Sequence, residues 1–506
     1  MTSDSFFGRS RTFLGVLLFV LYSLGMGIRL YDLTDPPLDF HPTRQLRSAI
    51  IARSIYYSTL PTAETWQRER AQEQMHGYGL IEPPVFENLV ALAYRVIGSD
   101  PVWVARIYAT LFWIVGGIAL YLMTSAMTSP DGGILALAYY LFVPFSVIAS
   151  RSFQPDPLMV MMIVLALWAY YRWYQRQSWG NAILAGILGG LALFIKAVAV
   201  YPIFFALAAY VLFGVGFRNA IRSSQVWVIG LLTILPVLVY HFYGIFILGS
   251  LESQFEGRFF PEMWRDPGFY IRWFNEVSRS LGYAGIVAGL FGALMFNRPV
   301  LRAFGVGLWI GYFLYGMSFP YHILTHSYYH LPLIPIIAIT IAPIGALIFR
   351  QFNALKPVWL TRLVVTGILF GGILIKVWDA RILLVQQDFH NEPAYWREIG
   401  DILGHDSSVV ALAHDYGNRL AYWGWITPRV WLPSGHLENY RTLRGGAPIE
   451  VQKWFADLTG NKDYFLVTLI GQLKKQPELN EILYDNYAIS AEGDGYIIFD
   501  LHKPLK

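Results

Sequence analysis

Acidic, imidazole and guanidinium side chains gather in a long polar segment after the first apolar run of the chain. The segment extends from residue 32 to residue 84, in a protein of 506 residues of which only 14% are charged. Charged side chains beside a membrane span are costly to keep and therefore suggest a functional site. The candidates here are Asp39, His41, Arg44, Arg53 and Glu82. A solvated loop with a helix at the membrane interface is the alternative.

Later segments add groups of the same kind. Asp156 lies between two prolines, Lys196 interrupts an apolar run, and His326, Tyr328 and Tyr329 share one turn. A carboxylate can act as a general base toward a hydroxyl, and cations can hold an anionic leaving group such as a phosphate. Together they predict group transfer from a phosphorylated donor.

Each of these residues also has a structural alternative. Asp39 and Asp156 could cap helices, and the Lys196 ammonium could reach the lipid headgroups. The tyrosine pair could belong to an interfacial aromatic belt. Asp156 is kept as a second candidate catalytic carboxylate beside Asp39.

The sequence gives little reason to expect a metal site or a cofactor. His322 and His326 are spaced as helical metal ligands would be, but no acidic residue accompanies them. The chain has no cysteine, which removes thiolate metal sites and cysteine nucleophiles. We therefore predict no certain cofactor and leave a divalent cation open. The net charge of +4 gives no reason to expect nucleic acid as a partner.

The elements that must position these residues are membrane helices. The chain is 55% hydrophobic, with a mean hydropathy of +0.43. This composition predicts a mainly α polytopic membrane protein with about eleven spans, within a range of ten to thirteen. The apolar runs cover residues 12–30, 102–127, 133–149, 157–174, 181–195, 197–215, 226–249, 281–296, 303–319, 331–349 and 361–378.

The first loop, residues 32–100, is expected to carry interfacial helices. Between Arg47 and Tyr57, apolar residues recur at nearly helical spacing, so this stretch should lie flat on the bilayer. The stretch from Val85 to Ile97 is too short to span.

Lys and Arg residues set the orientation, because they concentrate in alternate short loops. With a cytoplasmic N-terminus, the acidic and histidine-rich segments fall on the outer face. The protein is then an integral, multi-pass component of the plasma or inner membrane.

The last part of the chain changes character. Residues 1–378 form the predicted transmembrane domain, and residues 379–506 a soluble, extracytoplasmic α/β domain. In this domain, helix-like stretches at 393–403, 449–458 and 471–484 alternate with β-rich runs at 409–413, 464–469 and 496–501.

The chain resembles the type-C, polyprenyl-phosphate-dependent glycosyltransferases, especially the protein O-mannosyltransferase and aminoarabinose-transferase branch. The likeness covers roughly residues 12–350. It rests on short motifs in a fixed order: Asp39 after the first span, Ala49–Arg53, Glu82–Pro84, Pro101–Arg106, Arg151–Leu158, Phe194–Lys196 and His326–Pro332.

The resemblance implies inverting transfer of a sugar from an undecaprenyl- or dolichyl-phosphate carrier to an acceptor hydroxyl on the outer face. Asp39 matches the family's loop aspartate, the proposed base, and Lys196 and Arg53 would contact the donor phosphate. Many members carry an Asp-Glu pair where this chain has Asp39-Phe40, which leaves Asp35 and Asp32 as rival bases. Glu82 replaces a Lys or His of the family and favours a cation or a sugar hydroxyl.

The predicted protein is thus a hexosyl- or pentosyltransferase of the cell envelope. Its partners are the lipid-linked donor, a glycan, lipid or protein acceptor, and the bilayer. The alternative is a transporter or flippase of a polyprenyl-linked glycan, although alternating-access carriers place charge near the midplane and show repeated halves.

Overall fold

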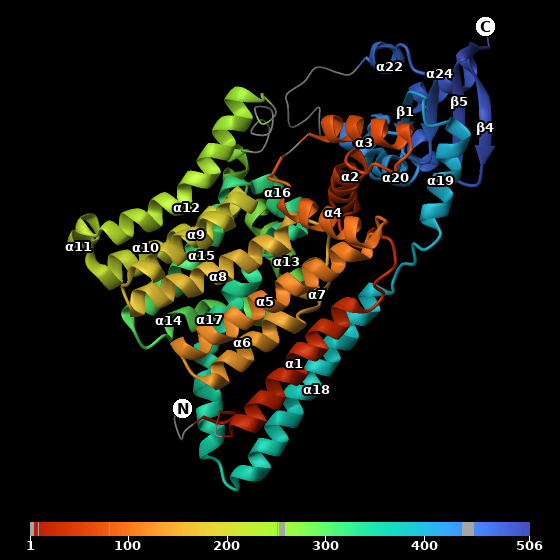
Figure 1. The fold of residues 1–506 in the computed structure, drawn as a ribbon. Helices are drawn as coiled ribbons and strands as arrows, with labels where there is room; N and C mark the ends of the chain where they lie inside the picture. Colours follow the sequence, from red (N-terminus) through yellow and green to blue (C-terminus); the bar gives the residue numbers. More distant parts are fainter. Residues whose placement is uncertain are drawn as a thin grey trace. The chain divides into compact units, whose positions relative to one another are not determined.

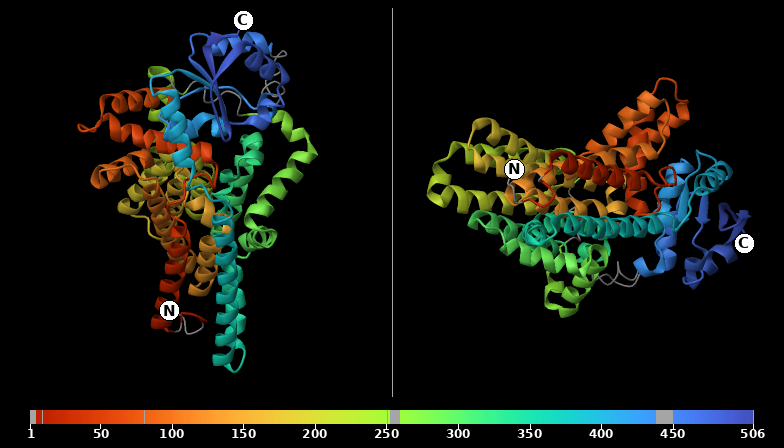
Figure 2. Two further views of the ribbon diagram at one scale, coloured as in Figure 1. Left: turned by 90° about the vertical axis from the view of Figure 1, so that its right-hand side faces the viewer. Right: turned by 90° about the horizontal axis from the view of Figure 1, so that it is seen from below.

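A computed structural model describes residues 5–8, 10–79, 81–249, 251, 259–437 and 450–505. The described chain is mostly helical, with a five-stranded sheet near its C-terminal end (Figures 1 and 2). It forms two compact units, which are described separately. The first, here called the membrane unit, contains Met1–Thr34, Leu80–Phe86 and Trp103–Gln387; the second, the loop–tail unit, contains Asp35–Gly79, Glu87–Val102 and Asp388–Lys506.

The membrane unit consists of long apolar helices. By length and composition, eight described segments could cross a membrane, or ten if each of two bent pairs is one span. The eight are α1 (Arg11–Leu30), α5 (Trp103–Met127), α8 (Pro155–Gln175), Ala197–Arg222, which includes α10 (Val200–Ala209) and α11 (Phe217–Arg222), Ser224–Ile247, which begins with α12 (Ser224–Phe242), α15 (Pro299–Ser318), Ser327–Ala354, which ends with α17 (Leu333–Ala354), and α18 (Val358–Leu384). A multi-span membrane protein is therefore confirmed.

The two bent pairs have local causes. α6 (Pro130–Phe142) and α7 (Pro144–Ser150) meet at 61°, where Pro144 removes a backbone donor. α13 (Pro267–Leu281) and α14 (Tyr283–Leu294) meet at 99°, where Gly282 adopts a φ of 83° that other residues rarely reach.

Each of the eleven predicted apolar runs has a helical counterpart. The described helices support eight to ten spans, which meets the predicted range of ten to thirteen at its lower end. One reason for the lower number is α9 (Trp179–Ile195), an apolar helix of 17 residues at the short end of the lengths that can cross a bilayer. Another is the run at 281–296, which proves to be one arm of the α13–α14 bend.

Small residues bring the spans close together. α17 packs against both α6 and α14, and 78% of the most apolar stretch of the span Ser327–Ala354, which ends with α17, is buried. A Cβ at Gly292 of α14 would collide with the carbonyl oxygen of Thr340, and one at Gly132 of α6 with that of Ala342. Close backbone approach of this kind drives helix association where lipid supplies no hydrophobic force. α1 and α18, far apart in sequence, also lie side by side (Figures 1 and 2).

In the loop–tail unit, the first loop supplies α2 (Pro42–Ser58), α3 (Thr65–Tyr78) and most of α4 (Val85–Ile97). α2 packs on α3 and on α20 (Asn418–Trp423), and its Ile50 and Ile51 are buried. Other helices of the same unit therefore cover α2, and its placement flat on the bilayer stays a prediction. α4 has the predicted bounds and exposes Leu92 and Val96, as an interfacial helix would.

The tail contributes an α/β layer, which agrees with the predicted fold class. The strands are β1 (Val409–Leu412), β2 (Arg429–Val430), β3 (Tyr464–Val467), β4 (Tyr487–Gly493) and β5 (Tyr496–Pro504), in the sheet order β2-β1-β3-β5-β4. β1 is parallel to β2 and β3, whereas β5 is antiparallel to β3 and β4. The remaining helices of the tail include α19 (Glu392–Leu403), α22 (Val451–Thr459), α23 (Ile470–Leu473) and α24 (Pro477–Asn486).

Side chains from these helices and strands form one apolar core, which includes Trp431, Phe455, Phe465 and Phe499. Two strands, β2 and β4, were not predicted, and the predicted helix at 471–484 is divided before Pro477, which begins α24. Residue 449, the predicted start of another helix, lies outside the described residues. The grouping of the first loop with the tail is a feature that chain order alone does not reveal.

Candidate functional site

Two helices of the membrane unit bring Asp156 and Lys196 together. Asp156 lies in the first turn of α8, and Lys196 directly follows the last residue of α9. Residues 176–178 join the two helices, which pack against each other. Because the helices of such a hairpin are antiparallel, the start of α8 lies beside the end of α9.

The two side chains form a buried ion pair. The Lys196 Nζ donates to Asp156 Oδ1 at 2.8 Å and to Oδ2 at 2.9 Å, and the two residues are 6% and 2% exposed. The partial positive charge at the start of α8 stabilises the carboxylate, and the partial negative charge at the end of α9 stabilises the ammonium. The two helix ends therefore stabilise both charges of the ion pair.

Aromatic rings surround the ammonium. Tyr328 and Tyr329 lie in η6 (Ser327–His330), with ring centroids 5.0 and 5.6 Å from the Lys196 Nζ, within the range of a cation–π interaction. Tyr329 stacks on Tyr315 of α15, at 5.5 Å between centroids and 8° between planes. We call Asp156, Lys196, Tyr315, Tyr328 and Tyr329 the lysine site.

Two histidines border the lysine site. The His326 ring lies 5.5 Å from that of Tyr328, and His322 lies 5.6 Å from Tyr329. The structure thus brings together five of the predicted site residues: Asp156, Lys196, His326, Tyr328 and Tyr329. Tyr315 was missed, because a tyrosine inside an apolar run carries no signal beyond its position.

Asp39 belongs to the loop–tail unit, just before α2. The buried Gln45 amide donates to Asp39 Oδ1 at 3.3 Å and to the Phe40 carbonyl oxygen at 2.7 Å. The N-cap position of α2 is His41, at a left-handed φ of 46°, and its side chain makes no capping bond. Asp39 is therefore not the N-cap residue of α2, which was the structural alternative for it. The left-handed backbone of His41, two residues further on, is a strained conformation of the kind that concentrates at functional sites.

Arg44 and His41 flank the same turn. Arg44 lies in the first turn of α2, and both side chains are partly buried. Burial, with a smaller contribution from the Arg44 cation, lowers the pKa of His41 to about 4. His41 is therefore neutral at pH 7 and offers hydrogen bonds but no charge.

Arg53 lies in a different part of the loop–tail unit. Its guanidinium donates to the carbonyl oxygens of Ala421, at 2.9 Å, and Tyr422, and to Gln74 Oε1 at 2.8 Å. It also lies 3.7 Å from the ring centroid of Trp425. Burial lowers its pKa. These contacts give Arg53 a structural role, and its predicted contact with the donor stays a prediction.

The rival bases also have partners. Asp35 is 3% exposed; its Oδ1 accepts from the Phe389 backbone N–H at 2.9 Å and lies 3.1 Å from His390 Nδ1. The Asp32 backbone carbonyl accepts from Arg106 at 3.2 Å and from Arg151 at 2.7 Å, which fixes the turn after α1. Glu82 lies partly buried in a bend before α4.

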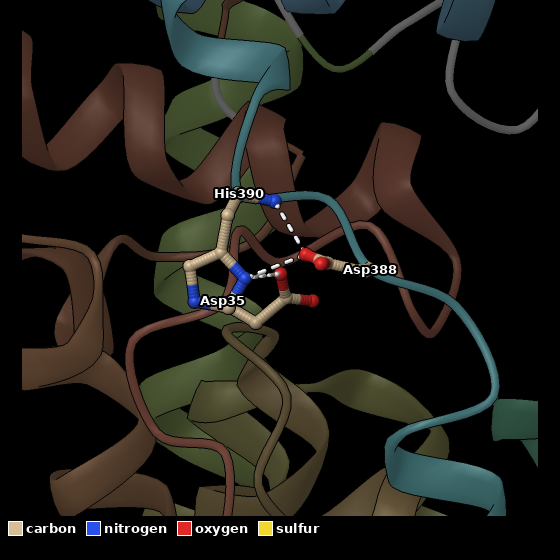
Figure 3. A group of neighbouring side chains, drawn as sticks. All are labelled: Asp35, Asp388 and His390. Atoms are coloured by element: carbon tan, nitrogen blue, oxygen red, sulfur yellow. Dashed lines mark hydrogen bonds and ion pairs between the residues drawn. The ribbon is translucent and has the colours of Figure 1, made fainter.

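Within the described residues, one group of three side chains could hold a metal ion. Asp35, Asp388 and His390 place their ligand atoms within 4.8 Å of one another (Figure 3). His390 Nδ1 lies 2.6 Å from Asp388 Oδ1, and the His390 backbone N–H donates to the same oxygen at 3.0 Å. These bonds, the backbone bond foremost, lower the pKa of Asp388. Hydrogen bonds alone explain this arrangement, so it does not require a metal.

Comparison with known proteins identifies the class. Residues 81–243 match the family of dolichyl-phosphate-mannose-protein mannosyltransferases. The lipid A galacturonosyltransferase RgtD of Rhizobium johnstonii is 24% identical over 122 residues, which are 24% of this chain and 26% of that protein. The matched part is thus about a quarter of that relative's length.

Solved structures extend the likeness to nearly the whole chain. ArnT from Cupriavidus metallidurans, bound to undecaprenyl phosphate, aligns with a TM-score of 0.60 at 14% identity, over 95% of this chain and 97% of that one. The oligosaccharyltransferase AglB from Archaeoglobus fulgidus, in complex with an inhibitory peptide and a dolichol-phosphate, aligns with a TM-score of 0.57 at 11% identity, over 96% of this chain and 74% of that one. Family match, relative and fold agree on one class, the type-C membrane glycosyltransferases. The resemblance drawn from the sequence is confirmed.

Proposed function

We propose that this protein transfers a sugar from a polyprenyl-phosphate donor to an acceptor hydroxyl at the outer face of the membrane. The observation that carries the proposal is the buried Lys196–Asp156 pair beneath Tyr328 and Tyr329. A charge buried in a membrane helix bundle is expensive and is typically retained for function.

Lys196 is the residue proposed to hold the donor phosphate. An ammonium has three N–H donors, and Asp156 takes two of them. The third can bond a phosphate oxygen, and the surrounding rings exclude water, which strengthens that bond. The undecaprenyl phosphate in the ArnT structure and the dolichol-phosphate in the AglB complex support a donor of this kind.

The proposed reaction has balanced steps. The acceptor oxygen attacks the anomeric carbon, the bond from that carbon to the phosphate oxygen breaks, and the polyprenyl phosphate leaves with the electron pair. The hydroxyl proton moves to the Asp39 carboxylate as the new glycosidic bond forms. Charge then increases on the leaving phosphate, where Lys196 stabilises it more strongly than in the ground state.

Asp156 is assigned a positioning role, with its own catalytic role as the alternative. Both of its oxygens accept from Lys196, so it fixes the ammonium toward the donor. His41, Arg44, Arg53, Glu82 and His326 are proposed to contact the donor or the acceptor.

The test is sugar transfer from a polyprenyl-phosphate donor pool by purified protein in matched detergent, with and without a chelator. Wild type should transfer sugar, whereas Asp39→Asn and Lys196→Met should not. Lys376→Met is the control, because Lys376 forms an exposed pair with Asp379 at 2.9 Å in the same unit. Full activity of Asp39→Asn would move the base to Asp35 or Asp156. Donor binding without any transfer would favour the flippase.

A further inference from the structure

The loop–tail unit contains a pocket that the proposed transfer step does not use. Its volume is about 210 Å³. Its lining comes from α3, from the turn between α19 and β1, from the segment that leads from α20 to β2, and from the turn between α22 and β3. Sites for drug-sized ligands enclose roughly 300 to 1,000 Å³, so this pocket suits one small ring. We call it the tail pocket.

One wall of the tail pocket is aromatic. Trp425 lines it at a φ of 60°, a left-handed conformation that a bulky residue rarely adopts. Such strain persists only where the surroundings hold it, and it concentrates at ligand sites. Trp66 contacts the Trp425 ring edge to face at 5.5 Å and stacks on His405, another lining residue, at 4.4 Å and 4°. Arg53 lies over the Trp425 ring, 3.7 Å from its centroid, so these contacts hold the ring in place and leave its other face or its edge for a ligand.

The rest of the lining offers short polar groups. The buried Gln74 amide serves the wall itself: its nitrogen donates to the Ala421 carbonyl oxygen at 2.9 Å and to Thr427 Oγ1 at 3.3 Å, and its oxygen accepts from Arg53. The Ser407 and Ser408 hydroxyls donate to the Leu403 carbonyl oxygen and to Asp463 Oδ2, so their oxygens remain as acceptors for a ligand. A pyranose ring presents apolar C–H faces and a rim of hydroxyls, which match an aromatic wall beside hydroxyl acceptors and cationic donors.

The charges in the lining favour an anion. Three cations, Arg70, Arg429 and Lys462, stand against the carboxylates of Glu73 and Asp406. Arg70 bonds both carboxylates, at 2.5 and 3.1 Å. Arg429 and Lys462 then have no carboxylate partner among the described residues. Two such cations beside a sugar-sized pocket would pair with a negative group on the ligand.

We propose that the tail pocket binds a sugar residue that carries a carboxylate or phosphate group. Such a residue would belong to the acceptor, so this inference rests on the proposed function for its place in the reaction. It assigns the acceptor to the acidic glycans or glycolipids and separates acceptor recognition from the lysine site.

The test measures binding by the full-length protein in detergent. Glucuronate, glucose and inorganic phosphate are titrated separately, and ligand-observed saturation-transfer NMR reports binding. Glucuronate should bind best. Lys462→Ala and Arg429→Ala should each weaken its binding about tenfold, since each removes a charge-assisted hydrogen bond. Lys475→Ala, an exposed lysine outside the pocket lining, should leave binding unchanged.

Three results would overturn the proposal. The first is that the wild-type protein does not bind glucuronate, and the second is that neither Lys462→Ala nor Arg429→Ala weakens glucuronate binding. The third is equal binding of glucuronate and phosphate, which would indicate an anion site without sugar recognition. Trp425→Phe is a second probe, because it keeps a ring while reducing the flat surface. The binding assay does not depend on transfer. A protein that transfers sugar but binds no glucuronate refutes the tail pocket alone, whereas one that binds glucuronate but transfers nothing refutes the proposed function alone.

Discussion

The buried pair of Lys196 and Asp156 leads to a quantitative prediction about stability. At 2.8 Å and an effective dielectric constant of about 20, the attraction between the charges is about 6 kcal/mol. Burial removes several kcal/mol of hydration from each ion, so the intact pair adds little net stability. Asp156→Ala removes the attraction while the ammonium stays buried, and we expect it to destabilise the protein by about 3–5 kcal/mol.

The double variant Asp156→Ala/Lys196→Met should recover most of the lost stability, because no lone charge remains buried. The measurement is the unfolding temperature in one detergent at one scan rate, since thermal unfolding of such proteins is usually irreversible. The control is Asp379→Ala. It removes the partner of Lys376 from an exposed pair, with side chains 54% and 42% exposed, and should change stability by at most about 1 kcal/mol.

Two outcomes would refute the reasoning. One is an Asp156→Ala protein as stable as the Asp379→Ala control, and the other is a double variant no more stable than Asp156→Ala alone. The double variant should be folded yet inactive in sugar transfer, which separates the structural effect of the pair from the proposed role of Lys196 in holding phosphate.

Three further predictions test other parts of the molecule. Gly292→Ala should destabilise the protein by about 1–3 kcal/mol through overpacking of α14 on α17, and Gly367→Ala, whose Cβ enters open space, should not; unfolding temperatures compare them. Arg53→Lys should cost about 3 kcal/mol of stability, measured by the unfolding temperature, because an ammonium cannot replace the fork that bonds two carbonyl oxygens and an amide oxygen. A hydrogen bond from His502 and two from Ser408 lower the pKa of Asp463 from 3.8 to about 2. The ionised carboxylate therefore stabilises the folded tail fully above pH 3.8, and this stabilisation is lost as the pH falls through about 2. Asp463→Asn should therefore lower the unfolding temperature at pH 6 but not at pH 2.

The spans were predictable because their cause is local. Lipid offers no partner to backbone N–H and C=O groups, so an apolar run long enough to cross a bilayer must be helical. The bends depend on single residues whose effect varies with context. Pro144 and Gly282 break helices, whereas Pro236 and Pro343 lie inside helices that continue. Composition alone does not distinguish these cases, so the sequence predicts a range of spans whose lower end meets the number that the described helices support.

The site was predictable where chemistry demanded a partner. A lysine inside an apolar run requires an anion, and the α8–α9 hairpin provides one 40 residues away. The surroundings of Arg53 could not be predicted, because its backbone partners Ala421 and Tyr422 lie 368 and 369 residues further along the chain. The pattern of neighbouring residues in the sequence does not indicate a contact over this separation. The burial of α2 follows from the same cause, since its covering helix α20 comes from the tail.

The environments of the two candidate carboxylates argue for different roles. A general base must take up a proton, and Asp156 could do so only by losing bonds from an ammonium to both of its oxygens in a buried position. Asp39 is less buried, and among its contacts is a long hydrogen bond from the neutral Gln45 amide, at 3.3 Å. We therefore propose Asp39 as the base for the acceptor hydroxyl, and Asp156 as the residue that positions the Lys196 ammonium for the phosphate.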